Sequence, residues 1–145
     1  RSLGVAEGDI VSMRYADAGV PLLSTAVLVR RPYAEANPRV VTGMIHAIAR
    51  GHAEALRAPD AAIAALVKRD PTAPADIERA RMMANFGFIR TPEVMQGGLG
   101  NLSMPRVQAS IDTLREVFNI AQPLRAEDLY DPRYLPPADA LRLPA

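Results

Sequence analysis

Residues 22–29 read Leu-Leu-Ser-Thr-Ala-Val-Leu-Val, and this short apolar run decides which fold the sequence predicts. The run ends at Arg30, Arg31 and Pro32. A continuous apolar run of strand length is typical of a strand buried on both faces, as in a parallel or mixed sheet. We therefore expect residues 22–29 to form a buried strand, and we expect the chain to belong to the α/β class.

A second strand is predicted just before this run. Residues 10–15 read Ile-Val-Ser-Met-Arg-Tyr, in which Val11, Met13 and Tyr15 alternate with polar residues, the period of a half-buried strand. A turn containing Gly19 separates the two segments. Two strands alone make a marginal sheet, so we expect partner strands to lie upstream of this sequence or to come from another molecule.

The chain after Pro32 has the spacing of helices. Asn37 and Pro38 form a strong helix start, and apolar residues then recur at helical intervals to about Arg57. Further helices should begin near Pro59, Pro74 and Pro105, and the helix that begins at Pro105 should run to Phe118. A flexible loop with Gly97, Gly98 and Gly100 should precede that last helix. From Gln122 onward several prolines predict an irregular segment.

Composition limits the function classes. The chain has 145 residues, of which 49% are hydrophobic and 23% are charged, the ordinary range of a soluble globular domain. Its net charge is +1, so nothing predicts binding to nucleic acid or to an anionic membrane. It has no cysteine, which excludes disulfides, zinc-thiolate sites and cysteine nucleophiles within the chain.

Five segments in a fixed order carry a resemblance to a known family. They are residues 15–20, Tyr-Ala-Asp-Ala-Gly-Val; residues 37–41, Asn-Pro-Arg-Val-Val; residues 58–63, Ala-Pro-Asp-Ala-Ala-Ile; residues 103–108, Ser-Met-Pro-Arg-Val-Gln; and the closing residues 124–136. Together they resemble the nitrate/sulfonate/taurine and thiamine-pyrimidine-precursor family of periplasmic solute-binding proteins. The similarity covers about residues 5–137. Ala18 stands where many relatives have an aromatic residue, and Met104 where they often have an aspartate.

The resemblance implies that residues 1–137 are the carboxy-terminal segment of a two-lobed solute-binding protein with the type II periplasmic-binding-protein fold. This segment would be mostly helical with about two strands, and residues 138–145 would be an irregular or disordered tail. The implied function is non-catalytic capture of a small organic or anionic solute for an ABC transporter. The implied partners are that solute, the ABC permease, and either the missing amino-terminal lobe or a second copy of the chain. The implied location is periplasmic or exported, with any signal upstream.

Four residues are candidates for contact with the solute. Asp17, Gly19, Ser24 and Thr25 lie where the resemblance places the return crossing between the lobes. Hydroxyl groups and backbone groups beside glycine commonly orient small ligands in such pockets. The alternative interpretation is that Asp17 closes an Asx-turn, while Ser24 and Thr25 form hydrogen bonds within the sheet.

Two other patterns do not indicate sites. His46 and His52 are six positions apart on one predicted helix, so they cannot chelate a metal as an i, i+4 pair would. We expect one of them to be partly buried and the other to lie at the surface. The loop at residues 97–100 follows no strand and lacks the Lys-Ser/Thr pair of a phosphate-binding loop. We expect no cofactor and no bound metal, which metal analysis of purified protein would check.

Two other functions stay open at this point. Some relatives make the thiamine pyrimidine from pyridoxal phosphate and a histidine of their own chain, so an enzyme of the same fold is one alternative. The other is a helical sensor or interaction domain that dimerises. Because the strands lack partners, we also expect the isolated chain to associate through residues 10–29.

Overall fold

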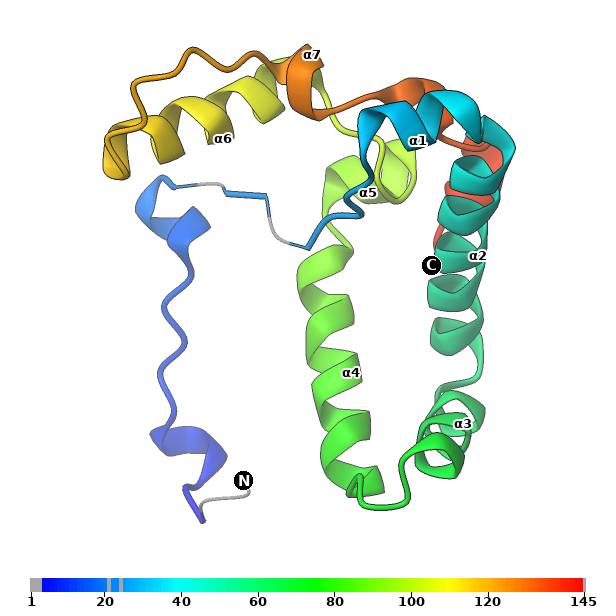
Figure 1. Ribbon diagram of the computed structural model, residues 1–145. Helices are drawn as coiled ribbons and strands as arrows, with labels where there is room; N and C mark the ends of the chain where they lie inside the picture. The colour runs from blue at the N-terminus through cyan, green and yellow to red at the C-terminus, as the bar shows by residue number, and fades with distance from the viewer. Residues whose placement is uncertain (1–3, 21, 24, 145) are drawn as a thin grey trace.

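The computed structural model describes residues 4–20, 22–23 and 25–144, and Figure 1 shows a series of helices preceded by a mostly irregular amino-terminal segment. The α-helices assigned in this part of the chain are α1 Arg31–Ala36, α2 Pro38–Arg57, α3 Pro59–Arg69, α4 Ala75–Ile89, α5 Pro92–Gly97, α6 Met104–Val117 and α7 Ala126–Leu129. Short 3₁₀ helices lie at Glu7–Asp9 (η1), Tyr15–Ala18 (η2), Pro132–Tyr134 (η3) and Ala138–Leu141 (η4).

Helices α2, α3 and α4 form a three-sided unit in which α2 and α4 run in opposite directions and α3 joins their ends (Figure 1). Prolines occupy the first positions of α2 and α3, where their missing N–H groups cost no hydrogen bond. The contact between α2 and α4 includes His52 and Phe86, whose rings meet edge to face with centroids 6.0 Å apart. Phe86 is buried, so this aromatic pair is a central contact of the unit.

The largest described core cluster lies around α6. Val107 and Ile111 of α6 pack with Ala126 of α7, and all three are buried. Partly buried side chains surround them: Leu23, Leu102, Met104, Leu124 and Tyr130. Farther along the predicted apolar stripe, Leu114 and Phe118 are exposed, so only the first half of α6 has a covered face.

Side-chain hydrogen bonds fasten the segment after α6 onto this cluster. The Gln108 amide accepts from the Ala126 N–H at 2.8 Å and donates to the Leu124 carbonyl at 3.2 Å. The Tyr130 hydroxyl accepts from the Leu102 N–H at 3.1 Å and donates to the Gly100 carbonyl at 3.0 Å. These bonds satisfy backbone groups that lie outside regular helices, and they hold α7 against α6.

The carboxy-terminal segment, residues 124–144, runs from the α6 cluster across to α2. Its short helices η3 and η4 both contact α2. Leu141 and Leu143 are buried, and the Leu141 carbonyl accepts from the Leu99 N–H at 2.8 Å. The irregular tail expected at 138–145 is therefore packed over its described residues, because its two leucines fill space beside α2 and the loop after α5.

The predicted helices are present with nearly the expected bounds. The helix expected at 37–57 is α2, and helices begin close to each of the three prolines named for the others. Helices α1 and α5 were not predicted. A start signal for α5 is nevertheless present at Thr91, Pro92 and Glu93, where the Thr91 hydroxyl accepts from the Val94 N–H at 3.3 Å. Among the described helices, none combines the length and the apolar character needed to cross a membrane.

The α/β fold class is wrong for this chain. In the described residues, segments 10–15 and 22–29 form no strand, and the segment expected to be buried on both faces is exposed from Thr25 to Val29. A strand exists only where its backbone N–H and C=O groups pair with a neighbouring strand. The two segments do not pair with each other, so the apolar pattern alone could not produce a sheet. The type II periplasmic-binding-protein architecture is therefore not found in these residues.

Acid should loosen α7, because Asp128 caps its first turn. The Asp128 carboxylate accepts from the side chain and backbone N–H of Arg125, and these bonds lower the pKa of Asp128 below its ordinary value. A lowered pKa means that the stabilisation is fully present above the ordinary pKa of about 4 and is lost as pH falls through the lowered value.

We expect the stability difference between the wild type and Asp128→Asn to shrink towards zero as urea unfolding is measured at decreasing pH. Asp9→Asn, which removes an exposed carboxylate far from α7, is the control and should show no such convergence. A difference that stays constant down to strongly acidic pH would contradict this role for Asp128.

Candidate interaction surface

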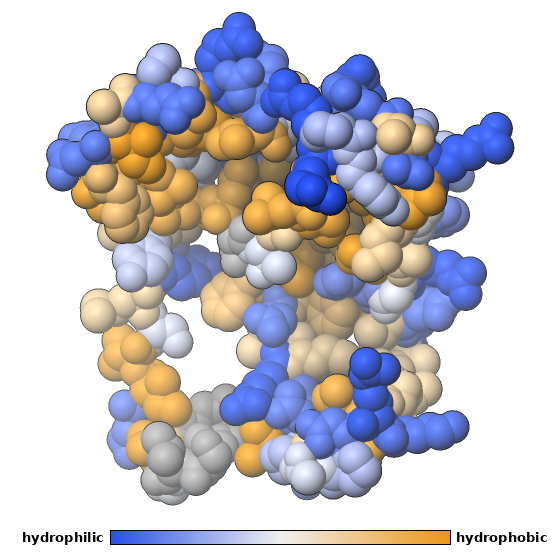
Figure 2. Space-filling view, viewed as in Figure 1, coloured by the Kyte–Doolittle hydropathy of each residue, from blue (hydrophilic) through white to orange (hydrophobic). Residues whose placement is uncertain are grey.

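The amino-terminal segment is the most exposed part of the molecule. We call its described residues, 4–20, 22–23 and 25–30, the arm. The arm stands apart from α4 along much of its length, and the space-filling view shows open space between them (Figures 1 and 2). Leu23 packs against the cluster formed by Val107, Ile111 and Ala126. The carboxy-terminal part of the arm is thus anchored to the α6 cluster through Leu23.

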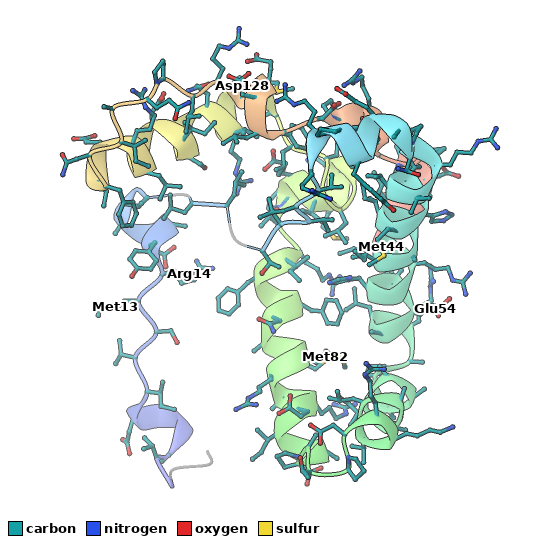
Figure 3. The ribbon with its side chains drawn as sticks, viewed as in Figure 1. Met13, Arg14, Met44, Glu54, Met82 and Asp128 are labelled. Atoms are coloured by element: carbon teal, nitrogen blue, oxygen red, sulfur yellow. The ribbon has the colours of Figure 1, made fainter. Side chains whose placement is uncertain are left out.

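Large apolar side chains of the arm face solvent. Met13 and Leu28 are each 90% exposed and Val11 is 84% exposed. Others on the same segment are also exposed: Val5, Ile10, Tyr15, Leu22, Val27 and Val29. Met13 and Arg14 project to opposite sides of the arm, as neighbours do in extended backbone (Figure 3). Single exposed apolar residues are ordinary, but a contiguous series on one segment marks a surface for association.

The total exposed area leads to the same conclusion. The chain exposes 10865 Å², whereas a compact protein of its 15.7 kDa mass exposes about 7,300 Å². The excess is about 3,600 Å². The chain buries about half of its extended-chain area, whereas about 68–70% is typical of a domain of this size. The chain therefore leaves exposed much surface that a compact domain of its size would cover.

A second exposed apolar group lies at the carboxy-terminal end of α6. It consists of Leu114, Val117, Phe118 and Ile120, of which Phe118 is 67% exposed. In the view of Figure 1 this end of α6 is drawn near the part of the arm that contains η2. Figure 2 shows hydrophobic side chains gathered over both elements on this face. We call this group the α6 end; like the arm, it exposes large apolar side chains.

The predicted solute residues lie on the arm and are not gathered into a pocket. Asp17 is exposed in η2, where its carboxylate accepts two hydrogen bonds from the Arg14 guanidinium at 2.8 and 2.9 Å. These bonds lower the pKa of Asp17 and raise that of Arg14. Gly19 follows η2 with φ 81°, the left-handed conformation that favours glycine. Both residues therefore have local roles in shaping a turn.

The other two predicted solute residues are Thr25 and Ser24. Thr25 is exposed on the arm, and Ser24 lies outside the described residues. The expectation that Asp17 closes an Asx-turn is replaced by an ion pair with Arg14, three residues before it. The described part of the chain forms no solute cleft around Asp17, Gly19 and Thr25, because all three residues are exposed to solvent on the arm.

An open hollow of about 370 Å³ with several polar groups lies between α5 and the start of α6. Its lining residues are Glu93, Gln96, Gly97, Asn101, Leu102 and Ser103. The carboxylate of Glu93 forms an ion pair with Arg106, and the Asn101 amide donates to the Gly97 carbonyl at 3.1 Å. The Glu93 and Asn101 side chains are thus engaged within the protein, and the Glu93–Arg106 pair ties α5 to α6.

The histidines have the places expected for them. His52 is half-buried, and because a carbonyl oxygen only accepts, its Nδ1 must donate to the Ile48 carbonyl at 2.9 Å. His46 is exposed. Within the described residues, no group of three or more histidines, cysteines or acidic residues is arranged to hold a metal ion.

Comparison with family models, with curated proteins and with solved structures gives no match for this chain.

Proposed function

We propose that this chain is the helical, non-catalytic part of a solute-binding component that serves an ABC transporter of an exported or periplasmic system. In this proposal the arm contacts the solute even when the chain is alone, but it leaves one side of the solute open. The arm meets another polypeptide, and the solute is held where the two join. Asp17, Gly19 and Thr25 lie on the arm and would face that junction.

The order of sequence features supports the proposal. Four of the five segments that carry the family resemblance coincide with the beginnings of α2, α3, α6 and α7. The remaining one, residues 15–20, contains η2 and the turn at Gly19. We thus propose the function that the resemblance implies, without the β-sheet that it also implied for residues 10–15 and 22–29.

The single observation that carries the proposal is the exposure of the apolar run. Val27, Leu28 and Val29 are 54%, 90% and 43% exposed, although the sequence pattern is that of a buried segment. A protein that exposed such a run permanently would be prone to aggregation. A covering polypeptide removes this conflict, and a binding protein that closes around its solute needs such a second part.

The test is a thermal-shift titration of the full chain with four solutes: nitrate, taurine, a hydroxymethylpyrimidine and benzoate. A solute that binds the folded state at a hundred times its dissociation constant stabilises it by about 2.7 kcal/mol, a readily measured shift in Tm. We expect one of the four solutes to raise Tm, and Thr25→Ala to abolish the shift.

The matched control is Thr113→Ala on α6, where the hydroxyl donates to the Ala109 carbonyl of its own helix. This variant should keep the solute shift. The proposal is wrong if no solute raises Tm, or if the two threonine variants respond alike. Binding of pyridoxal phosphate with a new absorbance band would instead support the enzymatic alternative.

A self-associating helical module is the second candidate function. The observation that favours it is the exposure of large apolar side chains on the arm and on the α6 end. This candidate needs no solute.

A further inference from the structure

We propose that two copies of this chain associate, each placing its arm against the arm and the α6 end of the other. This inference goes beyond the proposed solute-binding function, because it concerns which polypeptide covers the arm whether or not a solute is present. It identifies the occupant of the exposed surface as a second copy of the chain.

The amount of uncovered surface argues for an extensive and permanent partner. The excess of about 3,600 Å² per chain exceeds what a weak or transient contact covers. Stable obligate dimers bury about 2,000–5,000 Å² in total, counting both partners. Two copies that each cover about half of their excess surface would reach the middle of that range.

The character of the surface suits a contact between identical copies. A two-fold symmetric interface places the same patch of both subunits together, so the patch must be complementary to itself. The exposed arm residues Val11, Met13, Val27 and Leu28 are uncharged, and apolar side chains meet identical ones without electrostatic cost. The α6 end adds Val117 and Phe118, which extend the apolar area beyond the arm.

Charge does not oppose this association. The net charge of the whole chain is +1, so two copies do not repel strongly. On the arm, Arg14 and Asp17 are paired with each other at 2.8 Å, which neutralises both within one copy. A partner of strongly acidic or strongly basic character finds no matching field on this surface. An identical, nearly neutral partner fits it better.

The anchoring of the arm also fits. Leu23 holds the arm to the α6 cluster, and residues 10–15 extend away from that anchor (Figure 1). A second copy related by a two-fold axis can therefore receive this extended part without displacing Leu23 from its own cluster. The helical body of each copy need not change.

The decisive experiment is light scattering coupled to size exclusion on the full chain over micromolar concentrations. We expect the wild type to have the mass of a dimer. Val27→Lys puts a charge into the apolar interface and should weaken association by about 100-fold. The matched control is Val40→Lys on α2, since Val40 is 56% exposed and Val27 is 54% exposed. Val40→Lys should remain dimeric.

A second measurement locates the contact. The sequence contains no cysteine, so Thr25→Cys carries a single nitroxide label, and any defined dipolar distance must join two copies. We expect such a distance in the wild-type background and its loss in the Val27→Lys background, with helical content by circular dichroism unchanged. A monomeric wild type, a Val27→Lys variant as dimeric as the control, or a dimer without an inter-label distance would each overturn the inference. None of these results depends on solute binding, so they are independent of the titration that tests the proposed function.

Discussion

Replacing Gly98 with alanine is expected to lower the free energy of unfolding by about 3 kcal/mol. Gly98 follows α5 with φ 91°, a conformation that residues with a Cβ rarely adopt. A Cβ at this position would lie 2.6 Å from the Leu141 Cβ and 3.3 Å from the Leu141 backbone carbonyl. Because Leu141 is buried and its backbone is hydrogen-bonded to Leu99, the neighbour cannot move aside without opening the packing of the carboxy-terminal segment.

The measurement is chemical denaturation followed by circular dichroism, and Gly43→Ala is the matched control. Gly43 lies within α2, and a Cβ built there meets no atom within 4 Å. Alanine is the better helix former, so this variant should gain about 0.5–1 kcal/mol. A Gly98→Ala variant within about 0.5 kcal/mol of the wild type would show that Leu141 is not held against the loop.

Phe86→Ala is expected to destabilise the chain by about 3–5 kcal/mol, because it removes the largest buried side chain of α4. Phe86 is 5% exposed and meets His52 of α2 edge to face. Loss of the Phe86 ring leaves a cavity between α2 and α4 and removes the aromatic contact between these two helices. Urea unfolding monitored by circular dichroism measures the effect.

Phe88→Ala is the matched control, since it makes the same change two residues away on the same helix. Phe88 is 56% exposed, and surface substitutions of this kind usually change stability by less than about 0.5 kcal/mol. Equal losses in the two variants would mean that α4 does not pack against α2 through Phe86. A small loss in both would contradict the burial of Phe86.

The helical part of the fold could be predicted because its signals are local. Pro38, Pro59 and the apolar spacing after them act within one or two turns, and the helices begin where these signals lie. One partly buried histidine was expected on this helix, and the structure shows that it is His52. The α5 helix has a comparable start signal at Thr91 and Pro92, but only the glycine loop that follows this helix was predicted.

The candidate site could be predicted only as a stretch of chain. Asp17, Gly19 and Thr25 do lie on one segment, but all three are exposed to solvent and do not line a pocket of the described residues. Whether polar side chains make a pocket depends on what lies across from them, and sequence spacing along one segment carries no information about that. The ion pair of Asp17 with Arg14 is local, and the i, i+3 spacing of opposite charges could have indicated it.

The sequence by itself determined the helices α2, α3, α4 and α6, where they begin and that residues 22–29 are apolar, since these properties depend on neighbours a few residues away. The tertiary structure decided what the apolar run does. A strand requires a hydrogen-bonded neighbour that local sequence cannot supply, and in the described residues that neighbour is missing, so Val27 and Leu28 are exposed. The tertiary structure also decided the place of the carboxy-terminal segment. Leu141 becomes buried because α2 and the backbone at Gly98, distant in sequence, leave a space that its side chain fills.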